Sequence, residues 1–248
     1  MNNTLDFNRL QKVIRFDAIN YSQRFLKIMI IIIVSVLFGG WLIGTTQKVN
    51  INGDQRLSYL LICFLLTTIF APEKLYGNAN DSRNGIRFAM LPASALEKTI
   101  SMVLYCAIVT PILTGIIGLL TDGVLGLLPF GAFKGSFFAS QIGKQSSLIA
   151  DFFLQVFFYS CIFIFGTVLF KKRQILKTIA SLIALVVLLI CIATPAIFSQ
   201  YGEKVVVMIS GTFSLSNGTT EVLSLIIHYL FLAVLLFGIY RRIKKQKY

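Results

Sequence analysis

Few residues in this chain have the type and spacing that catalysis requires. The sequence has one histidine, His228, and two of its carboxylates, Asp151 and Glu221, lie singly near the ends of apolar segments. These residues supply neither a nucleophile with an adjacent base nor a set of metal ligands. We therefore interpret His228 as a hydrogen-bonded packing residue. We also interpret the four cysteines as small apolar packing residues, because they lie in separate apolar segments without CxxC spacing. They are Cys63, Cys106, Cys161 and Cys191.

The sequence also lacks a phosphate-binding loop. Its nearest approach is IGKQS at 142–146, which has no preceding glycine of the GxxxxGK[ST] pattern and places Gln after Lys. We expect this chain to bind no cofactor, so any ATP and Mg would be held by a partner subunit.

A defined phrase, RFAMLPASALEK at 87–98, stands between two apolar segments. Ser94 and Glu97 form an S-x-x-E capping box directly before an apolar run, and this pattern predicts a helix start. Pro92 has no amide hydrogen and biases Leu91 away from helical geometry, which predicts a sharp turn. Two interpretations of the preceding apolar residues stay open: a docking surface, or a segment dipped into the membrane interface.

Composition predicts the elements that must position these residues. Hydrophobic residues make up 56% of the 248, charged residues 13%, and the mean hydropathy is +0.79. A soluble domain has about 25% charged residues. We predict an all-α integral membrane protein with one transmembrane domain over residues 1–248. Six apolar runs of roughly 20 residues are long enough to cross a bilayer, at 28–46, 57–72, 99–120, 148–170, 178–198 and 222–240.

The distribution of basic residues predicts the orientation. Six spans place both termini on one side, together with segments 73–98 and 171–177. That side carries 18 of the 23 basic residues, and the ten acidic residues divide evenly between the two sides. Basic loops stay in the cytoplasm, so we predict that both termini are cytoplasmic. The charge of +13 is thus a topology signal, and we expect binding to membrane lipids but not to nucleic acid. The 18 are Arg9, Lys12, Arg15, Arg24, Lys27, Lys74, Arg83, Arg87, Lys98, Lys171, Lys172, Arg173, Lys177, Arg241, Arg242, Lys244, Lys245 and Lys247.

The segment before the first span is predicted to be an amphipathic helix at the membrane interface, over residues 1–27. Its apolar face carries Phe7, Leu10, Ile14, Tyr21 and Phe25, whereas Arg9, Lys12, Asp17, Gln23 and Arg24 lie mostly elsewhere.

On the opposite side of the membrane, segments 121–147 and 199–221 are too apolar for solvated loops. We predict that they are partly re-entrant or interfacial. Small residues, such as the pairs Gly40 with Gly44 and Gly115 with Gly118, favour close helix packing.

Taken together, the interfacial helix, six spans with both ends inside and the FAMLPASALEK phrase resemble the membrane subunits of type-2 ABC exporters. Many members of this family have an LP-x-S-x-x-E/K-like phrase between spans two and three. The resemblance covers the whole chain as a layout and about a dozen residues as a motif. Span two is shorter than in the family, and the apolar segment 121–147 is not part of its minimal pattern.

The resemblance implies a permease of the cell inner membrane that opens a path by alternating access. It implies two separate ABC ATPase subunits and a second permease copy, identical or paralogous, as partners. The loop 73–98 would carry the ATPase contact, formed by Asn84, Arg87, Phe88, Met90, Leu91, Pro92, Ser94, Glu97 and Lys98. Two alternatives stay open: a non-transport membrane scaffold or assembly subunit, and an intramembrane enzyme with convergent polar groups inside the bundle.

Overall fold

The computed structural model describes residues 6–48, 51, 53–77, 93–128, 133, 146–198 and 217–245. Within these ranges, only the backbone is described at 54, 146–151, 189–198, 217–228 and 245. Every regular element in this part of the chain is a helix, which confirms the predicted all-α fold.

The regular elements in the described ranges join into six continuous helices. The first and the third contain a π-helical segment, in which backbone hydrogen bonds reach back five residues instead of four. In chain order, the elements are α1 (Phe7–Asn20), η1 (Tyr21–Phe25) and α2 (Leu26–Thr46); α3 (Gly53–Tyr76); α5 (Ala95–Val103), η3 (Leu104–Val109) and α6 (Thr110–Gly126); α8 (Ser146–Leu169); α9 (Gln174–Phe198); and α11 (Asn217–Lys245).

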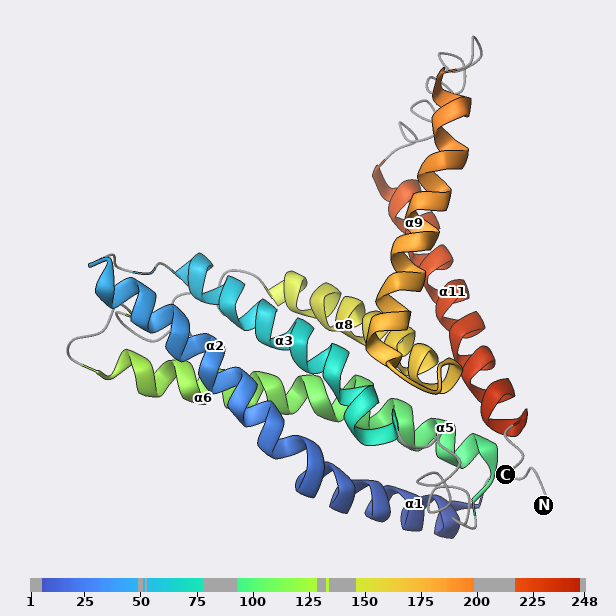
Figure 1. Ribbon diagram of the computed structural model, residues 1–248, viewed down its shortest axis with the longest axis horizontal. Coiled ribbons are helices and arrows are strands. Elements are labelled where there is room, and N and C mark those ends of the chain that lie inside the picture. Colours follow the sequence, from blue (N-terminus) through green and yellow to red (C-terminus); the bar gives the residue numbers. More distant parts are fainter. Residues whose placement is uncertain are drawn as a thin grey trace.

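Helices α2, α3, α6 and α8 form one bundle (Figure 1). Helix α3 is central to it, because α3 contacts α2, α6 and α8. Helices α9 and α11 extend away from the bundle in Figure 1, and each of them contacts α8. The starts of α1 and α5 and the end of α11 lie at the same end of the molecule (Figure 1), which is the end predicted to be cytoplasmic.

Four of the helices are long and apolar enough to cross a membrane, judged by length and composition over the described residues. They are Phe7–Thr46, Gln55–Tyr76, Ala95–Gly126 and Phe152–Leu169. Apolar side chains also cover their outer faces, since Ile31, Leu120 and Val124 are 63–66% exposed. This makeup is that of a multi-pass membrane protein. Crossing by α9 and α11 stays a prediction; the described part of α9 adds a shorter apolar stretch, Gln174–Leu188.

The N-terminal segment is helical from Phe7, but it differs from the sequence-based expectation in two ways. It continues into the first span without a break, through η1, and changes direction near that segment (Figure 1). In addition, Asp17 is only 4% exposed, whereas Phe7 is 77% exposed. The expected position of Asp17 away from the face of Tyr21 and Phe25 was wrong, because α1 packs against α5 and turns Asp17 toward hydrogen-bond partners in α3 and α5.

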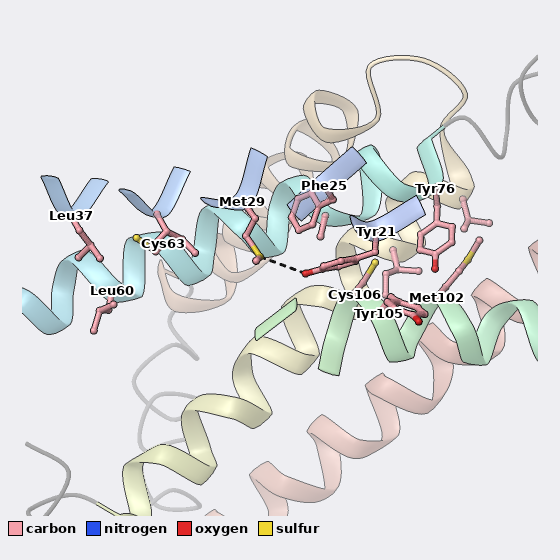
Figure 2. Packing of buried hydrophobic residues seen from close by; sticks show 14 of the residues in the cluster. Tyr21, Phe25, Met29, Leu37, Leu60, Cys63, Tyr76, Met102, Tyr105 and Cys106 are labelled. Atoms are coloured by element: carbon pink, nitrogen blue, oxygen red, sulfur yellow. Dashed lines mark hydrogen bonds between the residues drawn. The ribbon is translucent and has the colours of Figure 1, made fainter. Parts of the chain in front are cut away.

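A row of buried side chains at four-residue spacing organises the core along the first helix. At most 4% of each is exposed, and they are Val13, Asp17, Tyr21, Phe25, Met29, Ile33 and Leu37. In an α-helix, such a row drifts by about 40° at each step. The wider π turn of η1 counters part of this drift, so the row continues to face α3 and the third helix (Figure 2).

Glycines allow α2 and α6 to approach α3 closely. A Cβ atom at Gly40 would lie 2.8 Å from the ring of Tyr59, and one at Gly118 would lie 2.7 Å from the side chain of Leu60. Both distances are too short for a side chain to be added without a shift of the neighbour. The predicted packing role of these glycines is confirmed.

Candidate functional site

The predicted capping box is present at the start of α5. The amide of Ser94 donates to Oε2 of Glu97 over 2.7 Å, and the amide of Glu97 donates to Oγ of Ser94 over 3.3 Å. The backbone of Ser94 is extended, with φ −70° and ψ 160°, as an N-cap requires. The S-x-x-E pattern therefore predicted the first residue of this helix correctly.

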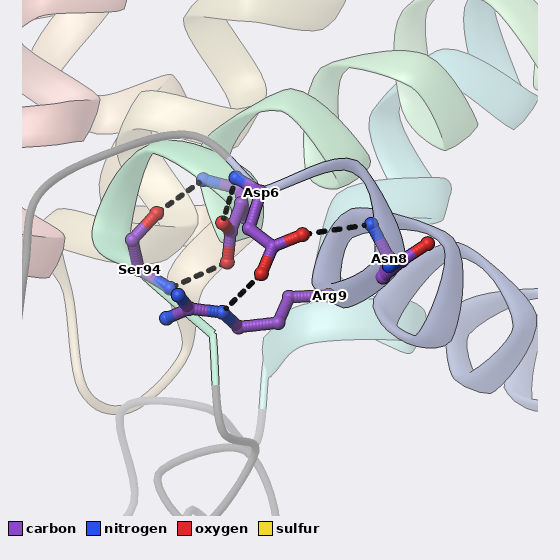
Figure 3. A network of polar contacts seen from close by, with 5 residues as sticks. Asp6, Asn8, Arg9 and Ser94 are labelled. Carbon is purple, nitrogen blue, oxygen red and sulfur yellow. Dashed lines mark hydrogen bonds and ion pairs between the residues drawn. The ribbon is translucent and has the colours of Figure 1, made fainter.

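The Glu97 carboxylate also reaches a second helix start. Its Oε1 accepts a hydrogen bond of 3.0 Å from the amide of Asp6, 91 positions away in the chain (Figure 3). Asp6 is itself the N-cap of α1 and accepts from the amide of Asn8 and from Nε of Arg9, each over 3.0 Å. One fully buried carboxylate thus joins the starts of α1 and α5. We call this arrangement of Asp6, Ser94 and Glu97 the helix-start junction.

The hydrogen bonds that Asp6 accepts at the helix-start junction favour its ionised form. The hydrogen bond from Arg9 and that from the amide of Asn8 lower the pKa of Asp6 from its ordinary value of 3.8. Asp6 also lies at a helix N-terminus, where the backbone dipoles stabilise negative charge. The junction therefore joins two helix starts through hydrogen bonds to Glu97.

The other predicted contact residues divide into two groups. Lys98 lies in the first turn of α5, is 8% exposed, and donates its amide to the carbonyl oxygen of Ser94 over 3.1 Å. The structure therefore brings Ser94, Glu97 and Lys98 together. The remaining six predicted residues lie outside the described ranges, and they are Asn84, Arg87, Phe88, Met90, Leu91 and Pro92.

A second polar cluster lies deeper along the first helix, at Asp17. Its Oδ2 accepts hydrogen bonds from the hydroxyl of Tyr76, over 2.9 Å, and from Oγ of Ser101. Asp17 thereby ties α1 to the end of α3 and to α5. Sequence analysis missed this cluster. The signal for it was the place of Asp17 in the four-residue row with Val13 and Tyr21.

The two π-helical segments meet next to the Asp17 cluster. The rings of Tyr21 in η1 and Tyr105 in η3 lie 5.8 Å apart between centroids. The Tyr21 hydroxyl lies within hydrogen-bond distance of Oγ1 of Thr110 (3.3 Å) and Sδ of Met29 (3.5 Å; Figure 2). Thr110 in turn donates to the carbonyl oxygen of Tyr105 over 2.8 Å, five residues back, as the π geometry allows. π segments are frequent at functional sites, and here two of them pack together.

A hydroxyl pair extends the polar line toward the bundle centre. Oγ1 of Thr114 lies 3.1 Å from Oγ1 of Thr67, which joins α6 to α3.

The predicted packing role of the cysteines is confirmed at three positions, since Cys63, Cys106 and Cys161 are fully buried. The side chains of Cys191 and His228 lie outside the described set.

A buried ion pair stands at the opposite end of the bundle. Nε of Arg56 in α3 donates to Oδ1 of Asp122 in α6 over 2.8 Å, and a second bond joins its NH2 group to Oδ2. The guanidinium carbon lies 4.8 Å from the ring centroid of Phe133. Both charged side chains are only 3% exposed. The third span was predicted to end at residue 120, whereas α6 continues to Gly126 and buries Asp122 against α3.

Two polar clusters connect helices near the predicted cytoplasmic end of the bundle. The helix-start junction and the Asp17 cluster connect three helices by hydrogen bonds that are largely withdrawn from water. Within the described residues, no group of three His, Cys, Asp or Glu side chains is placed to hold a metal ion.

Comparison with known proteins adds no relative to this picture. The chain matches no protein-family model, no curated protein and no solved structure.

Proposed function

We propose that the chain is the membrane-spanning permease subunit of an ABC exporter, which works as a dimer with two separate ATPase subunits. The observation that carries the proposal is the position of Glu97, which joins the starts of α1 and α5. Ser94 and Glu97 of this junction lie at the C-terminal end of the loop 73–98, which we propose as the ATPase contact. ATP and Mg would bind to the partner ATPase.

The proposed mechanism uses the hydrogen bonds of the site as a linkage. A displacement of the loop would move α5, and Glu97 would carry α1 with it. Asp17 would pass the movement to α3 through Tyr76. Since α3 contacts α2, α6 and α8, the bundle would respond as a whole. Alternating access requires that ATP-bound and ATP-free partners favour different arrangements of these helices.

The test is co-purification of the tagged chain with the ABC ATPase encoded by a neighbouring reading frame. The test variant combines Arg87→Glu with Leu91→Asp, and we expect it to lose the ATPase. A matched control combines Leu169→Asp, at the last residue of α8, with Arg173→Glu, directly before α9 and at the same four-residue spacing, and should retain it. Binding that survives the Arg87 and Leu91 changes would contradict the proposed contact.

A wild-type chain that recovers no ATPase would favour the scaffold alternative instead. Retained binding with lost transport, in a variant of Glu97, would place the defect in coupling rather than docking.

A further inference from the structure

An apolar groove of about 500 Å³ lies between the third helix and the C-terminal half of α11. Leu96, Ile100, Val103 and Ile108 line one wall, and Leu236 and Phe237 line the other. Several of these side chains face outward, since Ile100, Ile108 and Phe237 are 39–61% exposed. The groove is therefore open toward the surroundings of the helices, which in a membrane are lipid chains.

One end of the groove carries positive charge. Tyr240 lines the groove at this end, and Nζ of Lys244 lies 6.0 Å from the centroid of the Tyr240 ring. Arg241 and Arg242 follow Tyr240 directly, and Arg241, Arg242 and Lys244 are all exposed. Three exposed cations thus follow the groove-lining Tyr240 within about one helical turn.

We propose that this groove holds an acyl chain of an anionic glycerophospholipid, with the headgroup phosphate against Arg241 and Lys244. The apolar walls match the chain, and the cations at Tyr240 match the negative headgroup. A zwitterionic lipid also offers an acyl chain, but its headgroup has no net charge to pair with this cluster. The basic end coincides with the start of α5, where the cytoplasmic leaflet is predicted to lie (Figure 1). The inference does not depend on an ATPase partner.

The chain is well suited to a fluorescence test, because Trp41 is its only tryptophan. Among the residues that the structure describes, the Trp41 indole nitrogen has no hydrogen-bond partner, so Trp41→Phe removes no polar contact there. Phe237→Trp in this background places a single reporter in the groove, at a side chain that is 61% exposed. The full chain is reconstituted in phosphatidylcholine bilayers that contain increasing fractions of brominated phosphatidylglycerol or brominated phosphatidylcholine. We expect half-maximal quenching at a roughly tenfold lower fraction of the anionic lipid.

The charge requirement is tested with matched variants. Arg241→Gln combined with Lys244→Gln should bring the two quenching curves together. Lys171→Gln combined with Lys172→Gln removes the same charge from an exposed segment that does not line the groove, and it should leave the preference intact. Added salt should weaken the preference, since the headgroup contact is exposed.

Three results would overturn the proposal. They are equal quenching by the two lipids in the reporter chain, an unchanged preference after the Arg241 and Lys244 changes, and an equal loss of preference in the Lys171 and Lys172 control. Size-exclusion chromatography of each variant establishes that the protein is folded before the lipids are compared.

Discussion

Replacement of Glu97 by alanine tests the helix-start junction most directly. The substitution removes the acceptor of two backbone donors, the amide of Ser94 at 2.7 Å and that of Asp6 at 3.0 Å. A buried donor without a partner costs about 1–3 kcal/mol. The Ser94 amide is buried, whereas that of Asp6 is partly buried and can regain water. We expect Glu97→Ala to lower the free energy of unfolding by roughly 2–4 kcal/mol.

Two further variants divide this effect between the partners. Glu97→Gln keeps one acceptor oxygen but turns an NH2 group toward the second amide, so about half of the loss should remain. Ser94→Ala removes a longer hydrogen bond of 3.3 Å, and loss of an N-cap costs about 1 kcal/mol. The expected order of cost is therefore Glu97→Ala, then Glu97→Gln, then Ser94→Ala.

The assay is titration of the purified chain, in mild detergent, with a denaturing detergent while helix content is followed by circular dichroism. Hydrogen exchange at the start of α1 gives a second readout, since Glu97→Ala should expose amides that are 91 positions away in sequence. A cost for Glu97→Ala within about 0.5 kcal/mol of zero would refute the assignment of the junction as a structural clamp. Unchanged exchange in α1 would refute the linkage between the two helix starts.

Three further predictions concern other parts of the bundle. Gly39→Ala should stabilise the chain by up to about 1 kcal/mol, because a Cβ added there meets none of the described residues within 4 Å. Gly40→Ala should destabilise it by roughly 1–3 kcal/mol through overpacking against Tyr59, and the same detergent titration compares these neighbours. Asp122→Asn should cost roughly 3–5 kcal/mol in that titration by leaving Arg56 buried beside a neutral amide, and Arg56→Met with Asp122→Leu should recover most of the loss. The pKa of Asp6 is lowered in the folded chain, so its cap contributes fully above the ordinary value of 3.8 and is lost as pH falls through the lower folded pKa. Lower protection of the amides at the start of α1 in acid, measured against their intrinsic exchange rates, should report this loss, and Asp6→Asn should remove this change in protection.

Local patterns in the sequence identified several features that the structure confirms. Charge and hydropathy indicated an all-helical chain with helices long and apolar enough to cross a membrane, because a bilayer demands long apolar helices whatever their arrangement. The Ser94 and Glu97 pattern located a helix start, since a capping box forms between residues three apart. The close-packing role of Gly40 followed from the same kind of local evidence.

Tertiary structure decided where the polar groups meet. Asp17 is polar by composition and was expected on an outward face, yet the four-residue row buries it against Tyr76 and Ser101. Arg56 and Asp122 are 66 positions apart, and no periodicity within either helix indicates that they pair. Pairing of this kind depends on the register between two packed helices, which side chains from both of them determine together.

The side chain of Glu97 makes one contact that the local sequence determines and one that only the tertiary structure determines. One carboxylate oxygen accepts a hydrogen bond from the amide of Ser94, and this bond is determined locally because the two residues are three positions apart. Its other oxygen meets the amide of Asp6 only because α1 packs against α5 in the folded bundle. A capping box is a local motif that a sequence can display, whereas a shared cap between two helices exists only once the chain has folded.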